Sequence, residues 1–146
     1  MGRTLLLTGR PGVGKTTVVR KATRKLEAEA GGFFTEEMRC EGGRRVGFRL
    51  VTLDGEEAVM AHVDLRGGGR PRVSRYGVDV DAIDRVGVKA LREATASGSV
   101  VVVDEIGKME LFSDAFKEAV LDAVESEAPV LGTVMGGSRA WVEALK

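Results

Sequence analysis

The sequence predicts an α/β protein of three layers, in which helices cover both faces of a mainly parallel sheet that continues into an antiparallel extension. Four consecutive valines, 100–103, are typical of a strand buried on both faces, as in a parallel sheet between helices. The apolar strand 4–8 leads through a glycine-rich loop into an amphipathic helix. Residues 33–61 alternate in polarity between turn-forming clusters, which favours an antiparallel meander. With 146 residues, of which 43% are hydrophobic, we expect one domain over 1–146.

In the first half of the chain, the spacing of apolar residues predicts a helix over 17–30 that ends at Gly31 and Gly32. Polarity alternates after it, and glycine-containing turns divide the alternating residues into strands. The aperiodic stretch 66–72 predicts a surface loop, whose arginines we expect to be solvated, with contact to phosphate as the alternative. The expected strands cover residues 33–39, 46–53 and 58–61.

In the second half, Asp81 is the expected N-cap of a helix that closes at Ser97 and Gly98. Ser113 is the expected N-cap of the next helix, which follows the valine strand. A strand over 130–135 and a final helix containing Trp141 complete the expected elements.

The glycine-rich loop from Gly9 to Thr16 matches G-x-x-x-x-G-K-[ST], the phosphate loop of nucleoside-triphosphate enzymes. Glycines let the backbone amides approach a polyphosphate, and the following helix adds its N-terminal amides and dipole. Lys15 would reach the β and γ phosphates, Thr16 would bind Mg²⁺, and Thr17 would support the start of the helix. The expected nucleotide-binding residues are Gly9, Arg10, Pro11, Gly12, Val13, Gly14, Lys15, Thr16 and Thr17.

Two acidic residues, Asp104 and Glu105, follow the valine strand directly. Ligands of open α/β sheets bind at the carboxyl ends of the strands, so this pair should face the phosphate loop. We expect Asp104 to hold Mg²⁺ together with Thr16, and Glu105 to orient or deprotonate the attacking water. The expected catalytic residues are therefore Lys15 and Glu105. A strand end or helix cap with no catalytic role is the alternative interpretation of the acidic pair.

Other charged residues are weaker candidates. Lys108 either neutralises charge at the site or pairs with Glu105, and Arg139 either reaches the phosphates or starts an exposed helix. If the protein transfers phosphate to a small acceptor, residues at the end of the second strand would recognise that acceptor. Those residues are Glu36, Glu37 and Arg39.

Charge and cysteine content restrict the partners and the compartment. The net charge is zero, but residues 1–50 hold 11 basic and 5 acidic side chains, which suits a small anionic ligand better than an extended nucleic-acid surface. Cys40 is the only cysteine, so a reducing compartment is expected. His62 is the only histidine, and we interpret it as a surface residue. The sequence has no signal peptide or membrane span, so we expect a cytoplasmic monomer that binds nucleoside triphosphates.

Several motifs together resemble one family, the small P-loop nucleoside-triphosphatases called cancer-related or thermophile nucleoside-triphosphatases. The resemblance spans nearly the whole chain. The phosphate loop is shared by many families, whereas the Gly-Phe-Phe-Thr-Glu-Glu and Asp-Glu-Ile-Gly-Lys-Met-Glu runs are much more specific. The matching segments are Gly9 to Thr16, 32–39, 45–48, 76–80 and 104–110.

The resemblance implies a RecA-like core, in which another strand lies between the strand of the phosphate loop and the strand that ends at Asp104. It also implies Mg²⁺-dependent hydrolysis of ATP, GTP and other nucleotides with loose base preference. Members of the family continue beyond the strand matched by 130–135 with a basic lid, a strand and a helix. The sequence stops at Lys146, so in the expected single domain that last strand and helix are either absent or lie outside the sequence.

Two other functions remain open at this point. The same triphosphate machinery serves kinases that phosphorylate a nucleoside, a nucleotide or another small molecule. A nucleotide-dependent switch is a third reading, because residues 104–107 fit the Asp-x-x-Gly pattern of GTP switches, although the chain lacks an Asn-Lys-x-Asp run for reading guanine.

Overall fold

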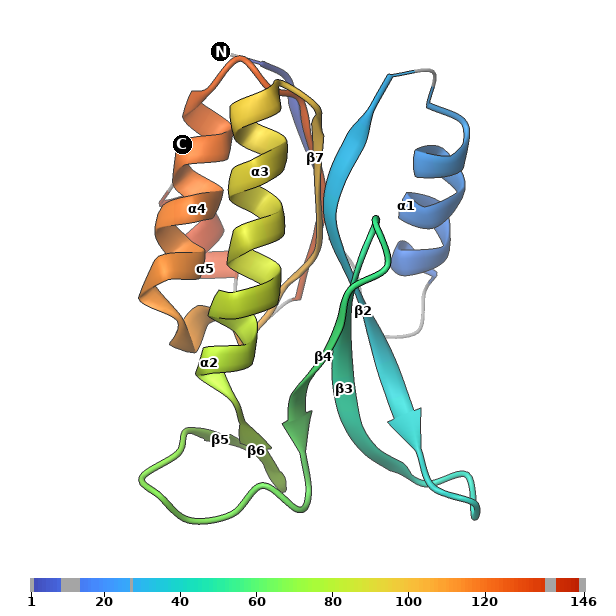
Figure 1. Cartoon of the computed structure of the whole chain (residues 1–146), viewed down its shortest axis with the longest axis vertical. Coiled ribbons are helices and arrows are strands. Elements are labelled where there is room, and N and C mark those ends of the chain that lie inside the picture. The colour runs from blue at the N-terminus through green and yellow to red at the C-terminus, as the bar shows by residue number, and fades with distance from the viewer. Residues whose placement is uncertain (1, 9–13, 27, 136–138, 145–146) are drawn as a thin grey trace.

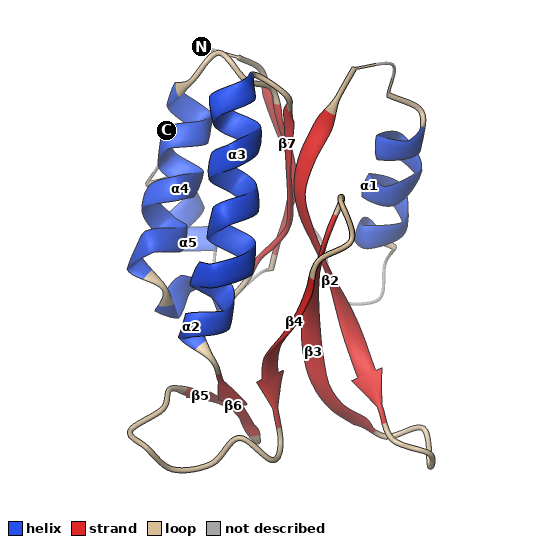
Figure 2. Ribbon diagram, viewed as in Figure 1, coloured by secondary structure: helices blue, strands red, loops and turns tan. Residues whose placement is uncertain are grey.

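The computed structural model describes residues 2–8, 14–26, 28–135 and 139–144, and within them it forms one eight-stranded sheet. The strand order is β1-β8-β7-β2-β3-β4-β6-β5. The strands are β1 (Thr4–Thr8), β2 (Ala30–Arg39), β3 (Arg45–Thr52), β4 (Glu57–His62), β5 (Arg72–Val73), β6 (Tyr76–Val78), β7 (Val100–Ile106) and β8 (Val130–Val134). Helices lie on both sides of the sheet (Figures 1 and 2), which confirms the predicted fold class.

The sheet has two parts that meet at β2. Strands β1, β8, β7 and β2 pair in parallel and form what we call the parallel half. Strands β3, β4, β6 and β5 follow β2 in antiparallel pairing and form the antiparallel arm. The arm contains the predicted meander and extends it by the short β5–β6 hairpin. Because β8 lies between β1 and β7, the inserted strand expected of a RecA-like core is present.

The helices divide unequally between the two faces of the sheet. Helix α1 (Lys15–Arg24) covers one face, and α3 (Lys89–Ser97) and α4 (Asp114–Glu125) cover the other (Figure 1). The remaining helical segments are α2 (Val80–Ala82), a π-helical turn (Ile83–Val88), a 3-10 turn (Glu110–Phe112) and α5 (Arg139–Glu143). None of the described helices combines the length and the apolar character that a bilayer span requires.

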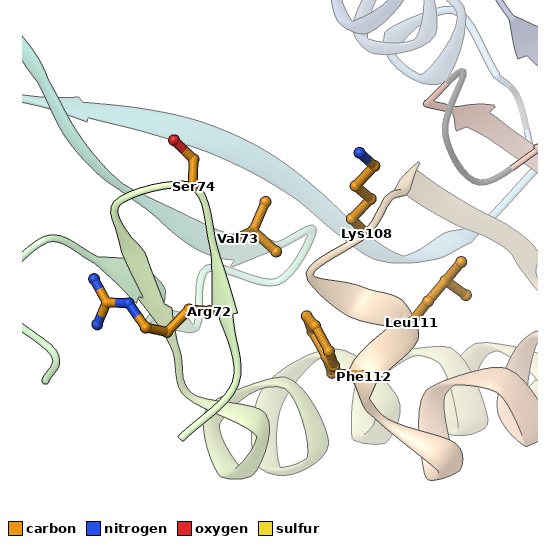
Figure 3. Close-up of a pocket in the computed structure, with 6 residues that line it drawn as sticks. All are labelled: Arg72, Val73, Ser74, Lys108, Leu111 and Phe112. Carbon is orange, nitrogen blue, oxygen red and sulfur yellow. The ribbon is translucent and has the colours of Figure 1, made fainter. Parts of the chain in front are cut away.

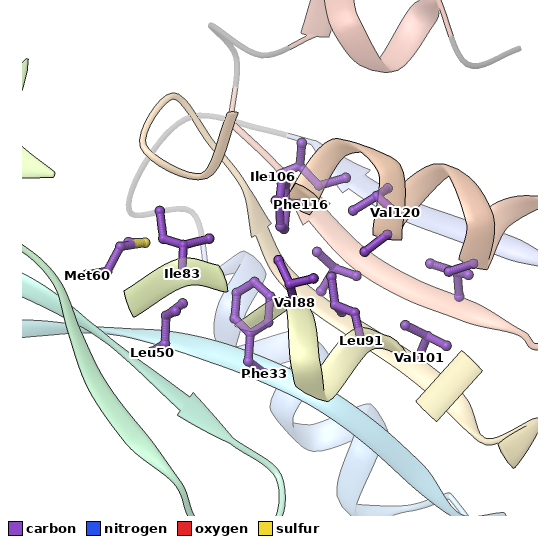
Figure 4. Close-up of a cluster of buried hydrophobic side chains, with 14 of the residues drawn as sticks. Phe33, Leu50, Met60, Ile83, Val88, Leu91, Val101, Ile106, Phe116 and Val120 are labelled. Carbon is purple, nitrogen blue, oxygen red and sulfur yellow. The ribbon is translucent and has the colours of Figure 1, made fainter. Parts of the chain in front are cut away.

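The valine strand contributes to a hydrophobic cluster on each face of the sheet. Val101 and Val103 pack on the side of α3 and α4, whereas Val100 and Val102 pack with Val19 of α1. The larger cluster joins Phe33 of β2 to the helices (Figure 4). Burial of β7 from both sides confirms the interpretation of the four valines and holds the end of this strand in a fixed place.

The predicted end of the first helix is wrong. Helix α1 ends at Arg24, and Ala30 already begins β2, so Gly31 and Gly32 are strand residues instead of a helix stop. A Cβ atom on Gly32 would lie 2.0 Å from the carbonyl oxygen of Val102, and its φ of 106° is a left-handed value. The glycine therefore serves close packing of β2 against β7.

The predicted N-cap of the second long helix is also wrong, by two residues. Asp79, not Asp81, has the extended backbone of an N-cap, and its carboxylate accepts a hydrogen bond from the Ala82 amide at 3.1 Å. Asp81 lies in the first helical turn and pairs with Arg85 at 2.7 Å. Acidic residues at both positions suit the helix N-terminus, which is why the sequence pattern alone did not separate them.

Candidate active site

The start of α1 brings two phosphate-loop residues to the carboxyl edge of the parallel half. Gly14, with φ of 93°, adopts a left-handed conformation that glycine tolerates without strain, and α1 begins at Lys15 directly after it. Thr16 is half-buried, whereas Thr17 is exposed. The expected contacts of Gly9, Arg10, Pro11, Gly12 and Val13 lie outside the described residues.

Thr16 and Asp104 are in direct contact, although 88 positions separate them in the chain. The Thr16 hydroxyl donates a hydrogen bond of 3.1 Å to Oδ1 of Asp104, and this bond joins the start of α1 to the end of β7. Lys15 lies beside them and donates from Nζ to the carbonyl oxygen of Val134, at the end of β8, at 3.1 Å. The three chain segments therefore meet at one point of the sheet edge.

Asp104 is buried among hydroxyl groups, with 1% of its surface exposed. Thr133 of β8 donates to its Oδ1 at 2.6 Å, and Thr35 of β2 donates to its main-chain oxygen at 2.7 Å. Burial raises the pKa of Asp104, and the hydrogen bonds from Thr133 and Thr16 oppose that rise. The second carboxylate oxygen, Oδ2, is buried without a hydrogen-bond partner. A buried carboxylate oxygen of this kind favours a nearby cation.

Glu105 occupies a different environment from its neighbour. It is half-buried, and its pKa is raised by burial, lowered by the charge of Lys15 and raised by the charge of Asp104. Glu105 thus combines partial access to solvent with a raised proton affinity, as a residue that accepts a proton from water requires.

A third acid, Glu110, forms a hydrogen bond to the backbone of the turn that follows Glu105. Its Oε2 accepts a hydrogen bond from the Gly107 amide at 2.9 Å, and the side chain is 2% exposed. Burial raises the pKa of Glu110 to about 8. A Cβ atom on Gly107 would lie 2.7 Å from this oxygen, so a glycine at 107 lets the carboxyl reach the backbone. Glu110 is therefore a positioning residue for the segment that carries Glu105.

The donor set at Asp104 fits a hard divalent cation. Oxygen ligands suit Mg²⁺, which typically binds through one or two protein groups together with substrate phosphates and water. The Thr16 hydroxyl and the unpartnered Oδ2 of Asp104 are such groups. Among the described residues there is no cluster of three or more His, Cys, Asp or Glu side chains that would hold a metal by itself.

The candidates on β2 form ion pairs with their neighbours. Glu36 accepts from Arg20 at 3.0 Å and lies 3.9 Å from Arg49. Glu37 pairs with Arg39 at 2.6 Å. All three candidates on β2 therefore have charged neighbours, and their recognition of a phosphate acceptor stays a prediction.

Lys108 faces a cavity beside the β5–β6 hairpin. It lines a cavity of about 470 Å³ together with Arg72, Val73 and Ser74 of the β5–β6 hairpin and Leu111 and Phe112 (Figure 3). No ion pair joins it to Glu105 within the part of the chain that the structure describes. Arg139 is the first residue of α5, and its side chain lies outside what the structure describes.

Sequence reasoning missed Thr35, Thr133 and Glu110. Thr133 is an ordinary strand residue in the sequence and Thr35 belongs to the family run 32–37 without a stated role, and the strand order β8-β7-β2 brings them to either side of Asp104. Glu110 had a signal, since it closes the acidic run 104–110, but its spacing gave no reason to separate it from a solvated acid.

A family model described as NTPase matches residues 4–146. The chain belongs to this NTPase family. Nucleoside-triphosphatase THEP1 of Thermotoga maritima is 46% identical over 142 residues, which cover 97% of this chain and 79% of the relative. The human cancer-related nucleoside-triphosphatase is 42% identical over 145 residues, which cover 92% and 76% of the two chains. The resemblance drawn from the sequence motifs is confirmed.

Solved structures agree with this membership. The crystal structure of THEP1 from the hyperthermophile Aquifex aeolicus superposes with a TM-score of 0.82 at 34% identity and covers 97% of this chain and 83% of its own. The solution structure of a human cancer-related nucleoside triphosphatase gives a TM-score of 0.77 at 41% identity, over 92% and 76% of the two chains. The sheet and its helices are thus those of the family.

Proposed function

We propose that this protein hydrolyses nucleoside 5′-triphosphates to the diphosphate and inorganic phosphate with Mg²⁺ as the metal ion. The observation that carries the proposal is the hydrogen bond between Thr16 and Asp104, which joins the phosphate-loop helix to the acidic strand end. Relatives named nucleoside-triphosphatases that match over most of the chain support the same reaction.

In this proposal, Lys15 and the loop amides bind the β and γ phosphates of the substrate, where the positive end of the α1 dipole also favours anions. Thr16 and Asp104 hold the metal. When bound, Mg²⁺ supplies positive charge to the phosphate oxygens as negative charge develops on them. Without a ligand, Lys15 donates to the carbonyl oxygen of Val134, and in this proposal it exchanges that partner for a phosphate oxygen.

Glu105 acts on the attacking water. Its carboxylate accepts a hydrogen bond from the water and aligns the water oxygen with the γ phosphorus. The bond from the γ phosphorus to the β–γ bridging oxygen breaks as the water oxygen bonds to phosphorus. The water proton passes to Glu105, and the electron pair of the broken bond leaves with the diphosphate. The raised pKa of Glu105 assists this proton transfer.

A product-resolved assay tests the proposal. The protein is incubated with Mg²⁺ and ATP, GTP, CTP or UTP, and nucleotide products and free phosphate are quantified together, with and without added nucleosides and nucleoside monophosphates. Equal amounts of diphosphate and free phosphate, without a need for an acceptor, are expected. A phosphorylated acceptor in place of free phosphate would overturn hydrolysis in favour of a kinase.

Lys15→Ala serves as the inactive reference, with turnover reduced by at least about 100-fold because it removes charge from the phosphate site. Lys89→Ala is the matched control, since Lys89 is exposed and pairs with Glu56 on the arm side of the molecule. Equal turnover of the two lysine variants would contradict the placement of the phosphate site.

A further inference from the structure

A hollow of about 280 Å³ on the antiparallel arm is surrounded by arginines. Three segments contribute to it: the start of β3 with the turn residue before it, the residues after β4, and the β5–β6 hairpin. Two valines complete the lining. We call this feature the arginine hollow, and its basic residues are Arg44, Arg45, Arg66, Arg72 and Arg75.

The charges of the hollow are mostly not neutralised by carboxylates. Arg45 lies 3.4 Å from Glu37, which also pairs with Arg39. The other four arginines form no ion pair within the described part of the chain, and the nearby Asp64 lies against His62. By contrast, Arg85 and Arg92 on the helices each pair with an aspartate, at 2.7 Å and 2.9 Å. The hollow therefore concentrates unneutralised positive charge.

Backbone carbonyls hold several of the guanidinium groups in place. Arg72 donates to Leu65 at 3.3 Å and to the carbonyl of Arg75 at 3.0 Å, and Arg75 donates to the carbonyl of Arg45. Arg66 donates from Nε to Val63 at 3.3 Å. A guanidinium has five N–H donors, so each group keeps donors for a ligand. Fixed groups lose less side-chain entropy when they bind.

The turn that carries Arg75 has an unusual backbone. Ser74 precedes it with φ of 55°, a left-handed value that is uncommon outside glycine. Arg75 also stacks over the Tyr76 ring, with its guanidinium carbon 5.4 Å from the ring centre. The hairpin thus presents Arg75 to the hollow from a constrained position.

We propose that the arginine hollow binds a chain of linked phosphates, as in inorganic tripolyphosphate or the triphosphate of a nucleotide. Guanidinium groups bind phosphate oxygens in pairs of parallel hydrogen bonds, and several unneutralised groups around one hollow favour a multiply charged anion. The volume is at the lower end of small-molecule sites, which suits a phosphate chain. This site is separate from Lys15 and does not depend on the hydrolysis proposed above.

Calorimetric titration of sodium tripolyphosphate into Lys15→Ala tests the proposal, because that background weakens the phosphate loop. One site is expected. Adding Arg44→Gln and Arg66→Gln should raise its Kd by at least about tenfold, since two cations are lost. The interactions of both side chains within the described residues are local, to Val63 for Arg66 and to Cys40 for Arg44, so circular dichroism and Tm should match the background. Arg85→Gln with Arg92→Gln removes the same charge elsewhere and should change Kd by less than about twofold.

A single-stranded oligonucleotide without terminal phosphates provides the second arm of the titration. Tighter binding of tripolyphosphate than of the oligonucleotide supports a phosphate-chain site. Binding of the oligonucleotide alone would replace the proposal with a nucleic-acid surface, and equal Kd values for the Arg44/Arg66 and Arg85/Arg92 variants would overturn it. The readout is heat of binding in an inactive background, so its failure is distinct from a failure of the hydrolase proposal.

Discussion

The parallel half and the antiparallel arm differ in where their charged groups lie: buried in the first and exposed in the second. In the parallel half, Asp104 is buried and receives hydrogen bonds from Thr16 and Thr133 on one carboxylate oxygen, while the other carboxylate oxygen is buried without a partner. On the arm, Arg66 and Arg72 are exposed and lack carboxylate partners among the described residues. Because Asp104 is buried, the loss of a single hydrogen bond or charge should change the activity of the parallel half strongly. Because the arginines of the arm are exposed, each should contribute little, and anion binding there should depend on several charges together.

This difference follows from how each part of the sheet is built. Parallel strands bring their carboxyl ends to one edge, where α1 and the ends of β7 and β8 converge on Asp104. Antiparallel strands are joined by tight turns, and the turns of the arm carry exposed arginines toward one another. Single substitutions should therefore have large effects in the parallel half and smaller ones at the surface.

The largest effect is expected for Asp104→Asn. Loss of the carboxylate charge at a buried metal position should reduce kcat/KM by at least about 1,000-fold, which corresponds to about 4 kcal/mol. The variant should keep its Tm, because the amide oxygen still accepts from Thr16 and Thr133. Phosphate release and thermal melts measure the two quantities. The matched control is Asp122→Asn, at an exposed aspartate; similar kcat/KM for both variants would refute the proposed role of Asp104.

Next in size is the loss of stability in Gly32→Ala. The added Cβ would lie 2.0 Å from the Val102 carbonyl oxygen, so β2 and β7 must separate, and we expect a loss of at least about 3 kcal/mol. Gly43→Ala on the arm shares the positive φ, at 81°, but has open space around it and should lose only about 1 kcal/mol. Urea unfolding compares the two; equal losses would mean that strand contact at Gly32 contributes nothing.

A smaller effect depends on pH and concerns Glu110. Its folded pKa of about 8 lies above the ordinary value of 4.5, so the folded state holds a proton that the unfolded state releases. Stability should therefore be full below about pH 4.5, fall as the pH rises toward 8, and then level off. Between about pH 5 and about pH 9, the wild type should lose more than about 1 kcal/mol relative to Glu110→Gln.

Urea titrations at several pH values measure this difference. Glu118→Gln, on the exposed side of α4, is the control and should follow the wild-type profile. If Glu110→Gln also follows the wild-type profile, Glu110 is not held neutral by the fold.

The smallest effect is expected for the surface pair of Arg92 and Asp122, which join α3 to α4 at 2.9 Å. Both side chains are exposed, so a double-mutant cycle with Arg92→Ala and Asp122→Ala should give a coupling free energy below about 1 kcal/mol. A larger coupling free energy would contradict the expectation that exposed charge pairs contribute less than buried ones.

Much of the parallel half could be predicted from local sequence. The four valines alternate between two faces whatever surrounds them, and the loop pattern before Thr16 has few other structural uses. The carboxyl-edge rule then predicts that Asp104 lies near Thr16, as the structure has it. These inferences succeeded because each rests on a short stretch of chain.

Features that depend on contacts between distant segments were not predictable in this way. Gly32 looks like a helix stop in sequence, but the approach of Val102 makes it a strand residue. Nothing in the sequence around Thr133 distinguishes it from other strand threonines, although its hydroxyl contacts Asp104 in the structure. The arginine hollow draws its residues from three separate segments of the chain, and only its two residues from the 66–72 loop, Arg66 and Arg72, were considered from the sequence, where they were expected to be solvated.

Glu105→Gln gives the most direct test of the central claim, that the edge of the parallel half is a hydrolytic site. Nucleotide affinity and phosphate release are measured on one preparation with Mg²⁺ and ATP. The variant should bind ATP within about threefold of wild type and lose at least about 100-fold in kcat, because only the alignment and deprotonation of water are removed. Unchanged kcat with unchanged affinity would contradict the assignment of Glu105 and the mechanism built on it.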